Sequence, residues 1–176
     1  MLVVLATGCA PDPEKERLKQ TTKATYDPKT GRLQLLTYDA DKNGRIDTWT
    51  YMDGTKVLRS EIDRDEDGKI DRWEFHREDG TLEKVGFSRA NEGKVDAWAY
   101  SGADGALARV EEDTNADGKP DKWETYTGGR KASVAFDENA DGRADRRLTY
   151  GPGGALLSIE SEPDAGGKFT KKVVVR

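Results

Sequence analysis

Short segments of this chain alternate between polar and aromatic residues, and this alternation predicts β-strands. Residues 47–51, 71–75 and 96–100 place their aromatic side chains two positions apart, which is typical of a strand with two different faces. Asp-Gly or Gly-Gly follows such segments within a few residues and favours a tight hairpin, because these residues adopt the positive φ that the turn requires. A second extended segment comes after each turn, so the pattern predicts one hairpin after another.

The hairpin pattern repeats every 24 or 25 residues. The repeat is marked by Gly44, Gly68, Gly93, Gly118 and Gly142, with a faded sixth copy at Gly167. Such regularity indicates that each unit is stabilised by its neighbours. We therefore expect an all-β fold over residues 25–176, a repetitive antiparallel β-meander of roughly six units with about two strands each, with tight turns along one edge and acidic loops along the other. The pattern does not decide whether the sheet stays open, curls or closes into a barrel.

The composition leaves little material for a hydrophobic core. Of the 176 residues, 34% are hydrophobic and 36% are charged, and 29 basic against 34 acidic residues give a net charge of −5. Because there is no basic excess or basic block, nucleic acid is not expected as a partner. The single histidine, His76, has no recurring partner, and the chain carries no glycine-rich phosphate loop or nucleophile motif. The sequence therefore predicts a protein that is not an enzyme and that is ordered by something besides apolar burial.

The loops around the marker glycines indicate a second source of order besides apolar burial. Four of them follow the pattern Asp-x-Asp/Asn-x-Asp/Asn-Gly-x-x-Asp. Ca²⁺ prefers about six to eight oxygen ligands in an adaptable geometry, whereas Mg²⁺ demands a tight octahedron. Asp, Asn and Gly also form ordinary turns, but a turn does not require oxygen-bearing side chains at the first, third, fifth and ninth positions together. The pattern therefore predicts about four Ca²⁺ sites.

These loops resemble the EF-hand-type calcium loops found outside true EF-hands, in dockerins, thrombospondin type-3 repeats and FG-GAP blades. The FG-GAP loops are the nearest of the three, because there too the loop joins two strands. The resemblance implies that the first, third, fifth and ninth residues bind the ion through their side chains and the seventh through its carbonyl oxygen. The implied ligands are Asp39, Asp41, Asn43, Arg45 and Asp47 in the first loop; Asp63, Asp65, Asp67, Lys69 and Asp71 in the second; Asp113, Asn115, Asp117, Lys119 and Asp121 in the loop of unit four; and Asp137, Asn139, Asp141, Arg143 and Asp145 in the loop of unit five.

The loop of unit three departs from the pattern. It has Ser88, Ala90 and Glu92 at the first, third and fifth positions in place of Asp or Asn, and keeps only Asp96 of the pattern. We therefore expect this loop to keep the fold and to bind no ion.

A glutamate at the twelfth position is inconsistent among the loops and occurs only as Glu74 and Glu124. In an extended chain Glu74 lies on the opposite face from Asp71 and Trp73. We therefore expect that neither glutamate is a ligand.

Four tryptophans recur two residues after the ninth loop position, namely Trp49, Trp73, Trp98 and Trp123. With two strands per unit, their rings are expected about 10 Å apart on one face of the sheet. One interpretation is a hydrophobic spine that covers neighbouring strands. The other is an exposed aromatic ladder that stacks on polysaccharide, and the sequence leaves both open.

The amino end resembles a bacterial lipoprotein signal, with apolar residues followed by Ala-Thr-Gly at positions 6–8 and the only cysteine, Cys9. The resemblance implies that Cys9 is acylated after cleavage and anchors the protein in a membrane, and Ala10 favours the outer membrane. The apolar stretch is short and lacks a basic start, and the alternative is a cytosolic chain with a free Cys9. The expected division is a signal remnant at 1–9, a polar tether at 10–24 and a single repeat domain at 25–176.

These features together predict a non-enzymatic calcium-binding lipoprotein of the bacterial cell envelope, on the periplasmic or the outer side of the outer membrane. It would act as a surface scaffold or interaction module in which calcium is structural, with a protein or polysaccharide partner that the sequence does not identify. The alternative functions are a carbohydrate- or cell-wall-binding module that uses the tryptophans, and a free calcium buffer.

Overall fold

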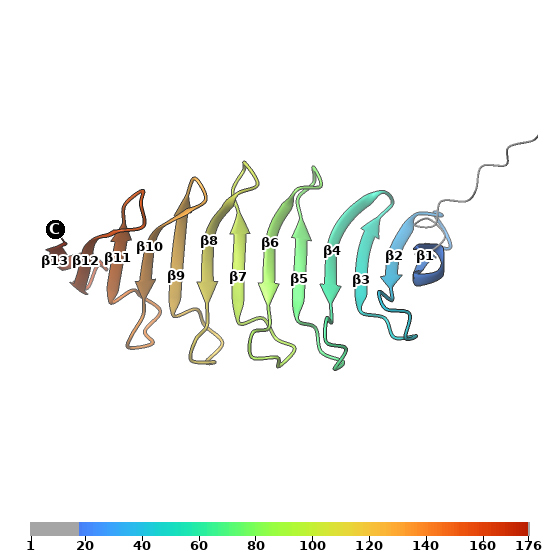
Figure 1. Ribbon diagram of the computed structural model, residues 1–176, viewed down its shortest axis with the longest axis horizontal. Coiled ribbons are helices and arrows are strands. Elements are labelled where there is room, and N and C mark those ends of the chain that lie inside the picture. The colour runs from blue at the N-terminus through green and yellow to red at the C-terminus, as the bar shows by residue number, and fades with distance from the viewer. Residues whose placement is uncertain (1–17, 176) are drawn as a thin grey trace, which may run out of the picture.

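The computed structural model describes residues 18–175, and in it 13 antiparallel strands form one sheet in chain order (Figure 1). The strands are β1 (Thr22–Tyr26), β2 (Leu33–Tyr38), β3 (Thr48–Asp53), β4 (Lys56–Ile62), β5 (Arg72–His76), β6 (Leu82–Phe87), β7 (Ala97–Ser101), β8 (Leu107–Glu112), β9 (Lys122–Thr127), β10 (Arg130–Phe136), β11 (Arg146–Tyr150), β12 (Leu156–Pro163) and β13 (Phe169–Val174). The structure confirms the repetitive β-meander. It also answers the question that the sequence left open, because β1 and β13 are the two free edges of an open sheet.

Each repeat contributes two strands. The five loops that contain the marker glycines join β2 to β3, β4 to β5, β6 to β7, β8 to β9 and β10 to β11, and they all lie along one edge of the sheet. The tight turns lie along the other edge (Figure 1). The six hairpins closed by turns on this second edge each have a register shift near the turn, for example between Tyr51 and Met52 and between Phe75 and His76. These bulges, which insert one extra residue in one strand, recur with the repeat.

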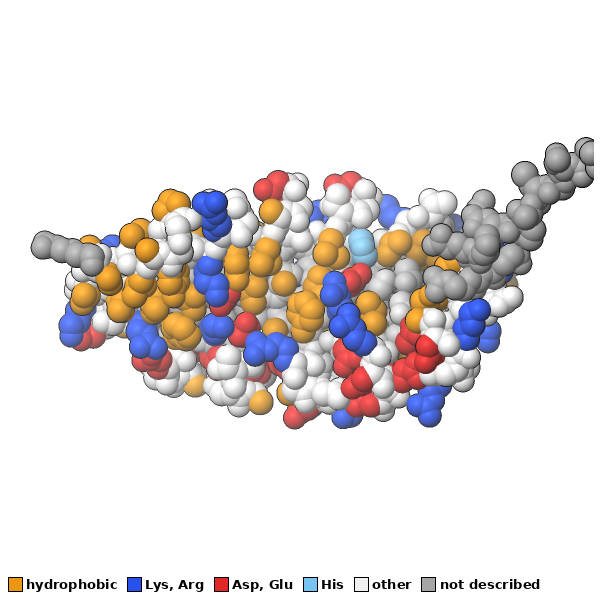
Figure 2. Space-filling view, in the orientation of Figure 1, with side chains coloured by type: hydrophobic (Ala, Val, Ile, Leu, Met, Phe, Trp, Pro, Cys, Tyr) orange, Lys and Arg blue, Asp and Glu red, His pale blue; other side chains and the backbone are white. Residues whose placement is uncertain are grey.

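The sheet is a single layer with almost no interior. Among the described residues, the only buried hydrophobic side chains are Val85, Ala97 and Val134, and no large side chain is fully buried. Figure 2 shows hydrophobic side chains in a band along the sheet, with acidic side chains near the loop edge. Because so little apolar surface is removed from water, the fold depends on pairing between adjacent strands and on contacts at the two edges.

Direct cross-strand pairing places the four tryptophans on one face, which we call the tryptophan face. Glu61 lies directly opposite Trp49 on one neighbouring strand and Trp73 on the other. Gly86 lies in the same way between Trp73 and Trp98. A Cβ atom on Gly86 would lie 3.0 Å from the Trp98 ring, so the missing side chain gives that indole room. All four tryptophans are half-buried.

Basic side chains lie over aromatic rings along the same face. The Arg59 guanidinium lies 4.0 Å from the centre of the Tyr51 ring, and the Lys84 ammonium lies 4.3 Å from that of Trp98. Such cation–π contacts are worth about 0.5–1 kcal/mol each at exposed sites. They partly replace the packing that a second layer would give.

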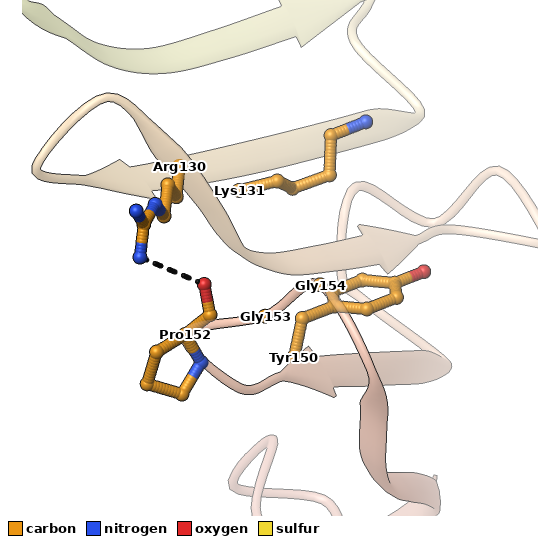
Figure 3. A pocket seen from close by; sticks show the side chains of 6 residues that line it. All are labelled: Arg130, Lys131, Tyr150, Pro152, Gly153 and Gly154. Carbon is orange, nitrogen blue, oxygen red and sulfur yellow. Dashed lines mark hydrogen bonds between the residues drawn. The ribbon is translucent and has the colours of Figure 1, made fainter.

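Arginines connect successive turns at the other edge. Arg77 Nη2 donates to the carbonyl oxygen of Ser101 at 2.6 Å, and Arg130 Nη1 donates to that of Pro152 at 3.0 Å. Figure 3 shows the second of these bonds beside Tyr150, in an open pocket of about 700 Å³ between two turns. Each bond connects turns that belong to adjacent repeats.

Glu124 is the centre of a charged cluster on the face opposite the tryptophans. Its side chain accepts bonds from the Tyr126 hydroxyl and from Lys131 Nζ at 2.7 Å, and it forms an ion pair with Lys122 at 3.1 Å. Burial alone would raise the pKa of Glu124, but these three partners lower it to about 2, and burial beside the carboxylate raises the pKa of Tyr126 to about 12.

We predict that Glu124→Gln lowers the free energy of unfolding at neutral pH by about 2 kcal/mol, because both lysines lose their buried counter-charge. The folded pKa lies below the ordinary 4.5, so this contribution is complete above pH 4.5 and is lost as the pH falls toward 2. Urea unfolding in chelator between pH 7 and pH 2 measures it. Glu138→Gln, which removes an exposed ion pair with Arg146, is the control and should cost less than about 0.5 kcal/mol. Equal losses in the two variants would contradict the prediction.

Candidate metal centre

The five loops share one backbone conformation. Their fourth residues have positive φ values of 54–66°, and these are Lys42, Glu66, Asn91, Ala116 and Ala140. Their sixth residues are the marker glycines, with φ values of 72–92°. The loop of unit three has this shape although it lacks Asp or Asn at the first, third and fifth positions, so the backbone alone does not distinguish a metal site from a turn.

Backbone amides hold the acidic side chains against their own loop. In the second loop, Asp63 Oδ2 accepts from the Gly68 N–H at 3.0 Å and Asp67 Oδ1 accepts from the Lys69 N–H at 2.8 Å. The ninth residue closes the loop from the other side, because Asp71 Oδ2 accepts from the Arg64 N–H at 2.7 Å. The loop thus gathers its carboxylates toward one point.

Asp63, Asp65 and Asp71 form an acidic group in which each residue offers an oxygen within 4.8 Å of the others. Asp63 is only 4% exposed, and its Oδ1 is buried without a hydrogen-bond partner. A buried carboxylate oxygen without a partner is costly unless a positive charge compensates it. These residues could therefore hold a metal ion, and an all-oxygen donor set suits a hard divalent cation.

The other three predicted sites have the same loop hydrogen bonds. Their first residues accept from the marker glycine N–H, at 2.9 Å for Asp39 and 2.8 Å for Asp113, and likewise for Asp137. Within residues 18–175, however, only the second loop brings three carboxylates within 4.8 Å of one another. Each of the other loops has an asparagine at one ligand position, and Asn139 Nδ2 donates to Asp145 Oδ1 at 3.1 Å. The remaining implied ligands lie in these loops, which are residues 39–47, 113–121 and 137–145.

The loop of unit three keeps its shape through a hydroxyl. Ser88 Oγ accepts from the N–H groups of Glu92 and Gly93 at 3.0 and 3.1 Å, as an aspartate does in the other loops. Asp96 Oδ2 accepts from the Ala90 N–H at 2.8 Å. This loop is a natural reference, because it has the same backbone and, of the four Asp/Asn positions in the pattern, keeps only Asp96.

The two glutamates of the twelfth position lie in ion pairs on the sheet. Glu74 Oε1 lies 2.6 Å from Arg72 Nη2, and Glu124 belongs to the cluster described above. Direct pairing places Ser60 opposite Glu74 and Glu61 opposite Trp73, so Glu74 and Trp73 are on opposite faces.

Side-chain contacts between neighbouring loops were not predicted from the sequence. In three loops the seventh residue directs its side chain to a backbone carbonyl oxygen of the next repeat: Arg45 Nη1 donates to Glu66 at 3.3 Å, Lys69 Nζ to Asn91 at 2.9 Å and Arg143 Nη1 to Ala165 at 3.1 Å. A signal was present, because the seventh residue is basic in all five loops, as Arg45, Lys69, Lys94, Lys119 and Arg143. The resemblance to EF-hand-type loops implies a role only for the carbonyl group of this residue.

Cys9 and most of the expected tether lie outside the described residues. Among residues 18–175, no helix is long and apolar enough to cross a membrane.

Comparison with known proteins gives no family for this chain. No family model and no curated protein matches it. Solved structures that it resembles include S. aureus TarM in complex with fondaparinux, alpha-GlcNAc-glycerol and UDP, at 16% identity over 56% of this chain and 21% of that chain, with a TM-score of 0.41. Accessory secretory protein 1, 2 and 3 of Streptococcus pneumoniae gives 15% identity over 66% of this chain and 19% of that chain, with a TM-score of 0.34. This chain spans about a fifth of their length, and TM-scores this low support no functional argument.

We predict that Asp65→Ala reduces the number of bound Ca²⁺ ions by about one, because it removes one of the three converging carboxylates. Equilibrium dialysis with metal analysis measures the count. The matched control is Glu92→Ala in the loop of unit three, which should leave the count unchanged. A count that falls equally in both variants, or in neither, would contradict the assignment.

Proposed function

We propose that this chain is a calcium-stabilised repeat protein that serves as a non-enzymatic scaffold in the bacterial cell envelope. The observation that supports this most is the buried, unpartnered Oδ1 of Asp63 inside a group of three carboxylates. This group lies at the edge of a sheet in which only three hydrophobic side chains are buried among the described residues. A cation in such a loop would supply the stabilisation that the missing core does not.

Binding to the folded loops converts directly into stability. An ion that binds the folded sheet and not the unfolded chain raises the free energy of unfolding by mass action. Four divalent ions would shift the formal net charge from −5 to +3, so repulsion among the loop carboxylates would be relieved. Modules of this sort outside cells bind calcium at about 10⁻⁴–10⁻³ M, which suits a structural ion.

The proposed location rests on the sequence of the amino end. A lipid on Cys9 and a tether of residues 10–24 would hold the sheet at the outer membrane, on its periplasmic or its outer side. The sheet then offers two long faces of different chemistry to a protein or polysaccharide partner.

We predict that excess Ca²⁺ raises the melting temperature of the protein by about 10 °C or more relative to chelator, since several ions each contribute about 1 kcal/mol or more. Differential scanning calorimetry measures the shift. The same concentration of Mg²⁺ is the control and should give a smaller shift. An unchanged melting temperature in Ca²⁺ would refute the structural role.

A second candidate function, carbohydrate binding, is favoured by one cavity. An open hollow of about 740 Å³ lies on the tryptophan face, lined by Trp123, Arg147 and small side chains that include Ser133 and Ala135. Ala135 pairs with both Trp123 and Arg147, so its small side chain leaves the space between them. An indole wall with hydroxyl and guanidinium groups nearby suits the apolar and polar faces of a sugar ring.

If this hollow binds a sugar, we predict that Trp123→Ala abolishes co-sedimentation of the protein with purified peptidoglycan and leaves the melting temperature nearly unchanged. Trp73→Ala is the control, because that residue pairs with Glu61 and Gly86 and does not line the hollow. Absence of wild-type co-sedimentation, or equal loss in both variants, would count against this candidate.

A further inference from the structure

The fourth residue of a loop reaches the loop that precedes it. Asn91, the fourth residue of the loop of unit three, directs its amide Nδ2 to Asp65 Oδ2 at 3.3 Å and to Asp67 Oδ2 at 3.1 Å. Both carboxylates are implied ligands of the second loop. The amide oxygen, Asn91 Oδ1, is buried and has no hydrogen-bond partner.

The position of Asn91 is fixed by its backbone. Lys69 Nζ donates to its carbonyl oxygen at 2.9 Å, and its own N–H donates to Ser88 at 3.2 Å. The two loops approach so closely that a Cβ atom on Gly93 would lie 3.2 Å from Lys69 Cβ. These contacts place the side chain of Asn91 against the second loop.

We propose that Asn91 belongs to the calcium site of the second loop and supplies a ligand oxygen from the adjacent repeat. The oxygen and nitrogen of a carboxamide exchange places when the group rotates by about 180°. Such a rotation of the Asn91 amide would present Oδ1 to a cation held by Asp65 and Asp67. Carboxamide oxygens are ordinary Ca²⁺ ligands. This inference rests on the proposed calcium function and explains what the loop of unit three contributes although, of the Asp/Asn positions in the pattern, it keeps only Asp96.

The first loop has the same arrangement with a carboxylate. Glu66, the fourth residue of the second loop, accepts a bond from Asn43 Nδ2, and its carbonyl oxygen accepts from Arg45 Nη1 at 3.3 Å. The corresponding residues beside the loops of units four and five are Ala140 and Ala165, which have no side-chain oxygen. The chain therefore contains two classes of site, two completed by the next repeat and two that are not.

A calcium titration of the full chain, followed by amide NMR, tests this site by site. The N–H groups of Gly68 and Gly118 bond to the first carboxylate of their own loops, so each reports one site. In the wild type, the Gly68 signal should respond at lower Ca²⁺ than the Gly118 signal. Asn91→Ala should weaken binding at Gly68 by about tenfold or more. The fold accepts alanine here, because Ala116 and Ala140 occupy the same position with φ values of 62° and 61°.

The complementary variant adds the missing oxygen. Ala140→Asn should strengthen binding at Gly118 by several-fold, and asparagine tolerates the positive φ of that position. Ala116→Asn makes the same chemical change beside the loop of unit three and should alter no site, so it is the matched control. Unchanged affinities in both Asn91→Ala and Ala140→Asn, with calcium still bound by the wild type, would overturn this inference alone. A wild type that binds no calcium would overturn the proposed function with it.

Discussion

The rest of this structure depends on one constraint, the electrostatic repulsion among carboxylates that are crowded along one edge of the sheet. The sheet has almost no interior that could offset this repulsion. A single layer exposes both faces to water, so burial of apolar surface contributes little, and among the described residues only Val85, Ala97 and Val134 form a core. Each strand is stabilised chiefly by its two neighbours. Repulsion between acidic loops therefore acts directly on the fold. The chain opposes that repulsion with backbone N–H groups, with basic side chains between loops and, in our account, with bound cations.

The spacing of the loops makes these contributions cooperative. In the four loops after the first, the first residue donates its N–H to the carbonyl oxygen of the ninth residue of the loop before it, as Asp63 does to Asp47 at 2.8 Å. Lys69 and Asn91 add side-chain contacts between the second loop and the loop of unit three. An ion in one loop would therefore order groups that the neighbouring loop also uses. The loop of unit three would transmit this order as well, because Ser88 Oγ holds it in the same shape.

Much of the fold could be predicted from the sequence because the repeat is regular. The glycine spacing gave the number of units, and Asp-Gly turns with period-two aromatics gave two strands in each. The open sheet could not be predicted, since closure depends on small twists that no single residue encodes. The contacts between loops were also missed: the fourth position is Lys42, Glu66, Asn91, Ala116 or Ala140, a variable set without a motif. Its role depends on how closely adjacent loops approach. The acidic ligand positions were visible, but the burial of Asp63 and the isolation of its Oδ1 were not.

Hydrogen exchange of the backbone amides in excess Ca²⁺ and in chelator tests the central claim most directly, because it reports the stability of each strand separately. If cations at the loop edge hold the sheet together, chelation will lower protection throughout the central strands β4 to β10, far beyond the loops themselves. If chelation lowers protection only within the acidic loops and the strands exchange as slowly as before, the sheet is held by strand pairing alone and the account is wrong.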